Sequence, residues 1–102
     1  MAKMNTTVKF ELNDGTVTDL TLTYYALYQM KAKNEGLYKR YNRIMTNGMT
    51  EELEMITVLY TAYVCAHLHD ESIMTEEEFM MGCGCDRKAV AEAVKKLTAP
   101  KN

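Results

Sequence analysis

The chain has 102 residues, of which 47% are hydrophobic and 25% are charged, and its formal net charge at pH 7 is −2. This length allows one hydrophobic core, and the composition is that of a folded globular protein, which excludes an intrinsically disordered chain. The small negative charge gives no electrostatic reason to expect nucleic acid or an anionic membrane as a partner.

The N-terminus and the cysteines indicate a compartment. Met1-Ala2-Lys3-Met4 leads into polar residues and not into an apolar run, so the sequence predicts no signal peptide. Three cysteines, an odd number, predict reduced thiols in a cytoplasm. We therefore expect a single cytoplasmic domain over residues 1–102.

The first predicted element is a β-hairpin over residues 7–22. Residues 8–12 alternate apolar and charged, and Asp14-Gly15 is a strong signal for a hairpin turn. In the return strand the apolar positions change parity between Val17 and Leu20, which predicts a bulge or a break near Thr18 and Asp19. A lone two-stranded hairpin is marginal in water, so this one must pack on helices or pair with another chain.

Residues 23–98 predict about five helices. The first runs from about Tyr24 to Lys33 with Thr21 or Thr23 as its N-cap. The second ends at Asn47-Gly48, and an apolar stripe follows its length. The stripe consists of Leu37, Tyr38, Tyr41, Ile44 and Met45.

The longest helical pattern, Thr50 to Asp70, is the predicted centre of the fold. Thr50 is its expected N-cap, and glutamates in its first turn match the helix dipole. Only a thin polar stripe interrupts its apolar surface, so the helix is expected to have neighbours on several sides. The stripe consists of Glu54, Thr57, Thr61, Cys65 and His69.

Two shorter helices complete the chain. Thr75 and Glu78 form a predicted capping box, and Gly82 is expected to end this helix. Asp86 caps the last helix, which Pro100 prevents from continuing. Its expected inner side consists of Val90, Ala91, Val94 and Leu97. The predicted fold class is α+β: a mostly helical single domain with an N-terminal β-hairpin.

One group of residues could hold a metal ion. Cys65 and His69 share a helix face, and Cys83 and Cys85 could complete a tetrahedral zinc set. However, the cysteine pair lacks the usual two-residue gap of a zinc knuckle, and the residues come from two distant segments. We expect no metal and no cofactor.

Catalytic chemistry has little support in the sequence. Cys85 precedes a helix with Arg87 and Lys88 nearby, but the intervening Asp86 opposes a thiolate. The glutamates at 76–78 are typical of a first helical turn that complements the dipole. The sequence predicts neither an enzyme nor a small-molecule substrate.

Residues 75–97 form a helix, a turn that contains glycine and a helix, which superficially resembles a DNA-binding helix-turn-helix. The second helix would offer basic side chains to DNA, namely Arg87, Lys88, Lys95 and Lys96. The first helix begins with three glutamates, which would meet phosphates in that pose. A small DNA-binding regulator is the alternative function.

The predicted helical hairpin ahead of the central helix is rich in tyrosine and methionine, more than one helix face can bury. Both residue types suit protein interfaces. The predicted partner-binding residues are Tyr24, Tyr28, Tyr38, Tyr41, Met45 and Met49. The alternative is that they close the core around the central helix, and each reading can hold for different members of the set.

The order of these elements resembles the small tail assembly chaperones of long-tailed bacteriophages and their prophages in Gram-positive bacteria. The resemblance covers roughly Lys9 to Leu97. It rests on the short hairpin, the stretch from Leu20 to Leu27, the long helix from Glu51 to Tyr63 and the Thr-Glu-Glu-Glu-Phe start at Thr75. Cys83-Gly84-Cys85 is not part of that pattern.

The resemblance implies a non-enzymatic protein of the bacterial host cytoplasm that coats the tape-measure protein during tail assembly and is absent from the mature virion. It also implies self-association, and a longer second product made by ribosomal frameshifting. Pro100-Lys101-Asn102 can be encoded as CCA-AAA-AAC, which contains a slippery heptamer. We expect a tape-measure protein or another tail protein as the partner, and no nucleic acid or membrane.

Overall fold

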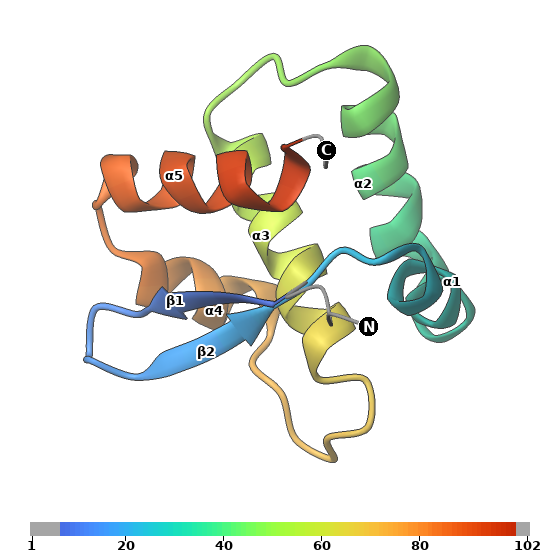
Figure 1. Ribbon diagram of the computed structural model, residues 1–102, viewed down its shortest axis with the longest axis horizontal. Helices are drawn as coiled ribbons and strands as arrows, with labels where there is room; N and C mark the ends of the chain where they lie inside the picture. Colours follow the sequence, from blue (N-terminus) through green and yellow to red (C-terminus); the bar gives the residue numbers. More distant parts are fainter. Residues whose placement is uncertain (1–6, 100–102) are drawn as a thin grey trace, which may run out of the picture.

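A computed structural model describes residues 7–99, in which a two-stranded antiparallel hairpin is followed by five helices (Figure 1). The strands are β1 (Val8–Glu11) and β2 (Val17–Leu20), and the helices are α1 (Tyr24–Lys33), α2 (Glu35–Asn47), α3 (Leu53–Ala66), α4 (Glu76–Cys83) and α5 (Arg87–Thr98). The predicted α+β class is confirmed.

The hairpin forms around the predicted turn, where Gly15 has a φ of +90°. The predicted bulge is wrong, because pairing continues without interruption from Val8 opposite Leu20 to Glu11 opposite Val17. Thr18 shares the inward side of β2 with Leu20 and is buried, whereas Val17 is exposed, so the apolar Val17 simply lies on the outer side of a regular strand. The Thr18 hydroxyl lies 3.5 Å from Nε2 of His67, so the buried polar group has a partner.

A single residue separates the first two helices. The side-chain oxygen of Thr23 accepts a hydrogen bond from the Ala26 N–H, which confirms one of the two expected N-caps of α1. Asn34 then ends α1, and its side chain accepts from the Leu37 N–H to cap α2. α2 ends before Gly48, as predicted.

α3 is the central element: β2, α1, α2, α4 and α5 all pack against it. Leu59, Tyr63 and Val64 are buried, as a central helix requires, and the predicted polar stripe is itself buried at Thr57, Thr61 and Cys65. The helix is shorter than the predicted segment, because its regular turns end at Ala66.

The predicted N-cap at Thr50 is wrong. α3 begins at Leu53, and Glu54 reaches back so that its carboxylate accepts from the backbone N–H of Thr50 at 2.6 Å and of Glu51 at 3.4 Å. A side chain in the first turn of α3 therefore accepts from two backbone N–H groups that lie just before the helix, where the threonine hydroxyl was expected to accept from N–H groups inside it.

The start of α4 follows the sequence, but its end does not. The capping box of Thr75 and Glu78 is present. The helix continues through Gly82 to Cys83 and ends at Gly84, where φ is +63°. Of the two glycines, only Gly84 has the positive φ that favours glycine at a helix end, which explains the error.

α5 begins at its predicted cap, Asp86. Its inner side contains Val90 and Val94 as expected, but Ala93 is buried there and Ala91 is exposed. The predicted break at Pro100 lies outside the described residues.

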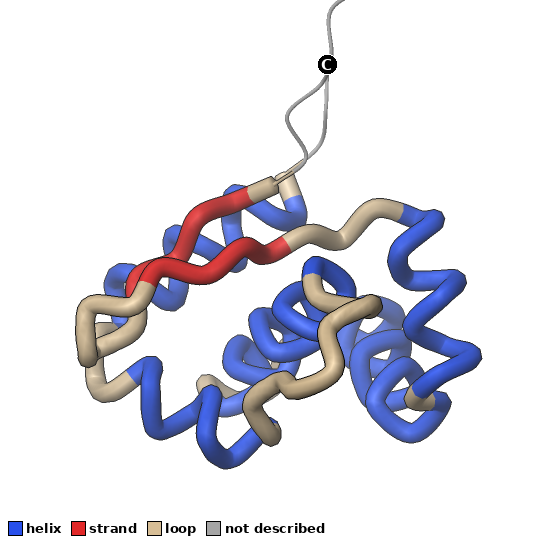
Figure 2. The backbone as a smooth tube through the Cα atoms, turned by 90° about the horizontal axis from the view of Figure 1, so that it is seen from below, coloured by secondary structure: helices blue, strands red, loops and turns tan. Residues whose placement is uncertain are grey.

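The core gathers around Phe79 of α4, which is fully buried. Its ring lies 5.3 Å from that of Tyr63, 5.8 Å from that of Tyr60 and 6.3 Å from that of Phe10. Aromatic pairs at such spacings add to the free energy of burial. The hairpin thus packs on the helices, and Figure 2 shows it as a layer of its own beside them.

Candidate functional site: an exposed tyrosine face on α1

Three tyrosines of α1 project into solvent. Tyr24 is 93% exposed, Tyr25 69% and Tyr28 73%, which are large values for aromatic side chains. We call these three residues the tyrosine face.

The spacing of apolar residues in α1 creates this face. Ala26, Leu27 and Met30 are buried, and they occupy the side of the helix that packs on α2 and α3. The tyrosines one or two positions away must then point outward. Tyr25 and Tyr28 are stacked with ring centroids 6.5 Å apart, which gives the face a defined shape.

Positive charge lies at the end of α1, beyond the tyrosine face. α1 contains no acidic residue, and Lys31 and Lys33 lie in its last turn. Nζ of Lys31 lies 5.2 Å from the ring centroid of Tyr38 on α2, a cation–π contact that joins the two helices. A partner with carboxylates beside apolar groups would complement this surface.

The predicted partner-binding residues divide into three groups. Tyr24, Tyr28, Met45 and Met49 are exposed, and Tyr38 is half-buried. Tyr41 is buried, and burial raises the pKa of its phenol, so it belongs to the core and not to the outer surface. Tyr25, which the predicted set leaves out, is part of the face because of its stacking on Tyr28.

The structure does not bring the four possible zinc ligands together. Cys65 and Cys83 are buried, whereas His69 and Cys85 are exposed. Among residues 7–99, no three His, Cys, Asp or Glu side chains converge on a position that could hold a metal ion.

Sequence reasoning missed a second set of exposed apolar side chains. Leu53 at the start of α3 and Met80 and Met81 on α4 are exposed. Leu53 and Met80 line a cavity of about 140 Å³, at whose rim Nε of Arg87 and Oε2 of Glu52 form an ion pair of 2.7 Å. The exposure of Met81, 71%, makes it a useful control for the tyrosine face.

The surroundings of the basic residues do not support the helix-turn-helix alternative. Arg87, a proposed DNA contact, is paired with Glu52, and Glu77 and Glu78 are exposed on α4. Such carboxylates repel phosphates.

In the part of the chain that the structure describes, no helix combines the length and apolar character that crossing a membrane requires. No family model, curated protein or solved structure matches the chain. The chemistry of the exposed face is therefore the main guide to function.

Proposed function

We propose that the protein is a non-enzymatic chaperone of phage tail assembly, which binds the tape-measure protein in the bacterial cytoplasm. The tyrosine face is the observation that carries this proposal. Tyr24, Tyr25 and Tyr28 together expose a cluster of aromatic side chains, the kind of surface that protein–protein interaction sites use. Tyrosine presents a large apolar area at low entropic cost, which suits reversible binding.

The form of the protein supports the same function. Its helical hairpin, α1 and α2, holds the face on regular structure, with α2 fixed by its own cap at Asn34. A rigid helical surface can shield apolar stripes of a helical client by packing helix against helix. The resemblance in element order to tail assembly chaperones points to the tape-measure protein as that client.

Co-expression with the tape-measure protein, followed by pull-down, tests the proposal. We expect the unaltered protein to keep the tape-measure protein soluble and to co-purify with it. The double substitution Tyr24→Ser/Tyr28→Ser should abolish co-purification without unfolding the chain, because both side chains are exposed.

Met81→Ser is the matched control, since it removes a similarly exposed apolar side chain on α4. It should leave binding unchanged. Equal loss in both variants, or a tape-measure protein that is soluble alone and ignores this chain, would contradict the proposal.

A further inference from the structure

Three sulfur-bearing side chains border one cavity at the end of α4. This cavity, of about 140 Å³, lies where the starts of α3 and α5 meet the end of α4. Met80, Cys83 and Cys85 all line it. Two thiols and one thioether from a single short stretch of the chain therefore share the same space.

The local fold of residues 80–85 gathers these side chains. Met80 and Cys83 are three residues apart on α4, so they are neighbours on one face of the helix. The chain turns at Gly84, where φ is +63°, and Cys85 then borders the same cavity. Cys83 is buried, whereas Met80 and Cys85 are exposed. Solvent therefore reaches the cavity at two of the three sulfur-bearing side chains.

The chemistry of these ligands selects a soft cation. Thiolates and thioethers together favour copper(I), which is satisfied by two or three such ligands. Structural zinc sites instead use four ligands, mostly thiolates and imidazoles. Within residues 7–99 no set of three His, Cys, Asp or Glu side chains is placed to bind an ion, so a zinc set is not available. The methionine is the ligand that distinguishes a copper(I) site here.

The charges around the cavity suit a bound cation better than a free thiolate. Glu52 and Asp86 line the cavity and are exposed, and the nearby Arg87 is paired with Glu52 at 2.7 Å. Burial raises the pKa of Cys83 to about 11, which disfavours its free thiolate. A metal ion nevertheless deprotonates a coordinating thiol outright, because its own charge takes the place of the proton's. The acidic rim, which opposes a nucleophilic cysteine, attracts such an ion.

We propose that Met80, Cys83 and Cys85 bind one copper(I) ion in this cavity, through two thiolates and one thioether. On binding, each thiol releases its proton to solvent, and the ion stays copper(I), so no electron is transferred. The bound ion would hold Cys85 against the last turn of α4. This site is independent of the tyrosine face and of the proposed function.

The probe is copper(I), titrated without oxygen into the full, reduced chain in competition with a chromogenic copper(I) chelator. We expect saturable binding of one ion per chain, a thiolate-to-copper charge-transfer band in the ultraviolet, and no change in oligomeric state. Silver(I), a soft cation that stays monovalent, should bind the same site and permits NMR. On silver(I) binding, the methyl signal of Met80 should shift and that of Met81 should not.

Substitutions at the exposed positions test the ligands with little risk to the fold. Cys85→Ser should weaken copper(I) binding about a hundredfold or more, and Met80→Leu, which keeps the side-chain volume, about tenfold or more. These losses are expected because even a residue that only supports a metal ligand contributes about ten- to a hundredfold to affinity. Met81→Leu is the matched control on α4, and should bind copper(I) as tightly as the unaltered chain.

Several results would overturn the inference. These are no saturable copper(I) binding by the unaltered chain, binding that Cys85→Ser leaves intact, and equal affinity of Met80→Leu and Met81→Leu. A complex in which two chains share one ion would show that Cys85 binds the metal between molecules, and would also replace the proposed site within one chain.

Discussion

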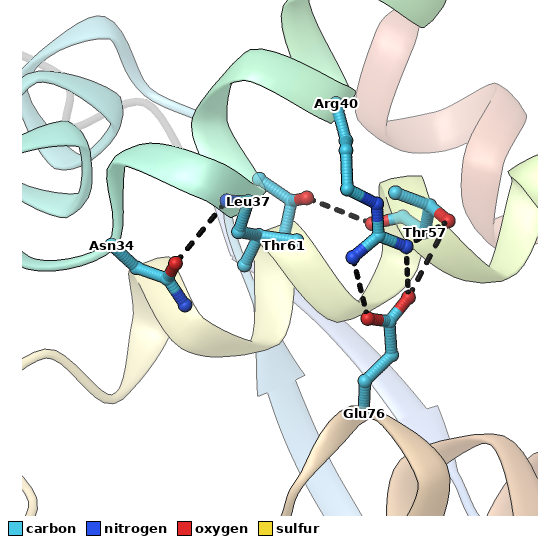
Figure 3. Close-up of polar contacts among 6 residues, drawn as sticks. All are labelled: Asn34, Leu37, Arg40, Thr57, Thr61 and Glu76. Atoms are coloured by element: carbon cyan, nitrogen blue, oxygen red, sulfur yellow. Dashed lines mark hydrogen bonds and ion pairs between the residues drawn. The ribbon is translucent and has the colours of Figure 1, made fainter.

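The guanidinium of Arg40 and the carboxylate of Glu76 form a two-pronged ion pair that joins α2 to the first turn of α4. Nη1 lies 2.8 Å from Oε1 and Nη2 lies 2.7 Å from Oε2, and both side chains also reach the hydroxyl of Thr57 on α3 (Figure 3). Three consecutive helices are thus tied together at one point.

Removing this pair should destabilise the fold modestly. We expect Arg40→Ala to lower the free energy of unfolding by about 1 kcal/mol, because the pair has good geometry but is partly exposed. Urea unfolding at pH 7 measures this change. Lys9→Ala, which breaks the more exposed pair with Asp19, should cost less and serves as the control.

The same pair predicts a pH dependence. The hydrogen bond from Arg40 lowers the pKa of Glu76 from its ordinary 4.5, so the unfolded chain takes up this proton before the folded one. The resulting stabilisation is fully present above about pH 4.5 and is lost as the pH falls through the lower folded-state pKa. Glu76→Gln should lack this pH-dependent stabilisation. If the free energy of unfolding of the variant depended on pH as that of the unaltered protein does, the assignment would be wrong.

Local signals predicted much of the fold, because they act within a few residues. The Thr75 and Glu78 capping box, the Asp86 cap and the Gly15 turn all satisfy backbone groups close to them in sequence. The pair of Arg40 and Glu76 could not be predicted in this way, because its members are brought together only when both helices pack on α3.

The candidate site illustrates the same limit. Tyr24 and Tyr41 both occupy apolar positions of helical patterns, yet one is 93% exposed and the other 9%. The difference depends on which side of each helix meets α3, and a single sequence carries no direct record of that choice. Helical spacing therefore predicted the tyrosine-rich hairpin but not the membership of its exposed face.

The start of α3 gives a further test. Because the Glu54 carboxylate accepts from the Thr50 and Glu51 N–H groups, Glu54→Gln should destabilise the chain more than Thr50→Ala, which keeps the backbone donor. The hydrogen bond from the Thr50 N–H also lowers the pKa of Glu54. The stabilisation by Glu54 is fully present above its ordinary pKa of 4.5 and is lost as the pH falls through its lower folded-state pKa, so the difference between the variants should shrink in acid. If Thr50→Ala lost more stability than Glu54→Gln, the result would favour Thr50 as the cap.

The exposure of the thiols gives a further prediction. Cys85 is exposed, whereas burial raises the pKa of Cys65 to about 12 and that of Cys83 to about 11. At pH 8 in native buffer, a chromogenic disulfide reagent should react rapidly with one thiol and with the other two only after denaturant is added. Cys85→Ser should remove the rapid phase. Rapid reaction of more than one thiol in the native protein would show that Cys65 or Cys83 is accessible.

The two glycines near the end of α4 should differ in how strongly they respond to alanine. Gly84 has a φ of +63°, and an added Cβ would lie 3.3 Å from Nδ2 of Asn13, so Gly84→Ala should cost about 1–3 kcal/mol. At Gly82 the helical backbone accepts alanine, which favours the helix by about 1 kcal/mol. There the Cβ would lie 3.1 Å from a methyl group of Leu12, which must move slightly and offsets that gain. We therefore expect Gly82→Ala to change the free energy of unfolding by less than about 1 kcal/mol in either direction.

Thermal and urea unfolding of the two variants measure the contrast. If Gly82→Ala were the more damaging, the helix would end at Gly82 as the sequence alone suggested, and the hydrogen bond from Asn13 to its carbonyl would need another explanation.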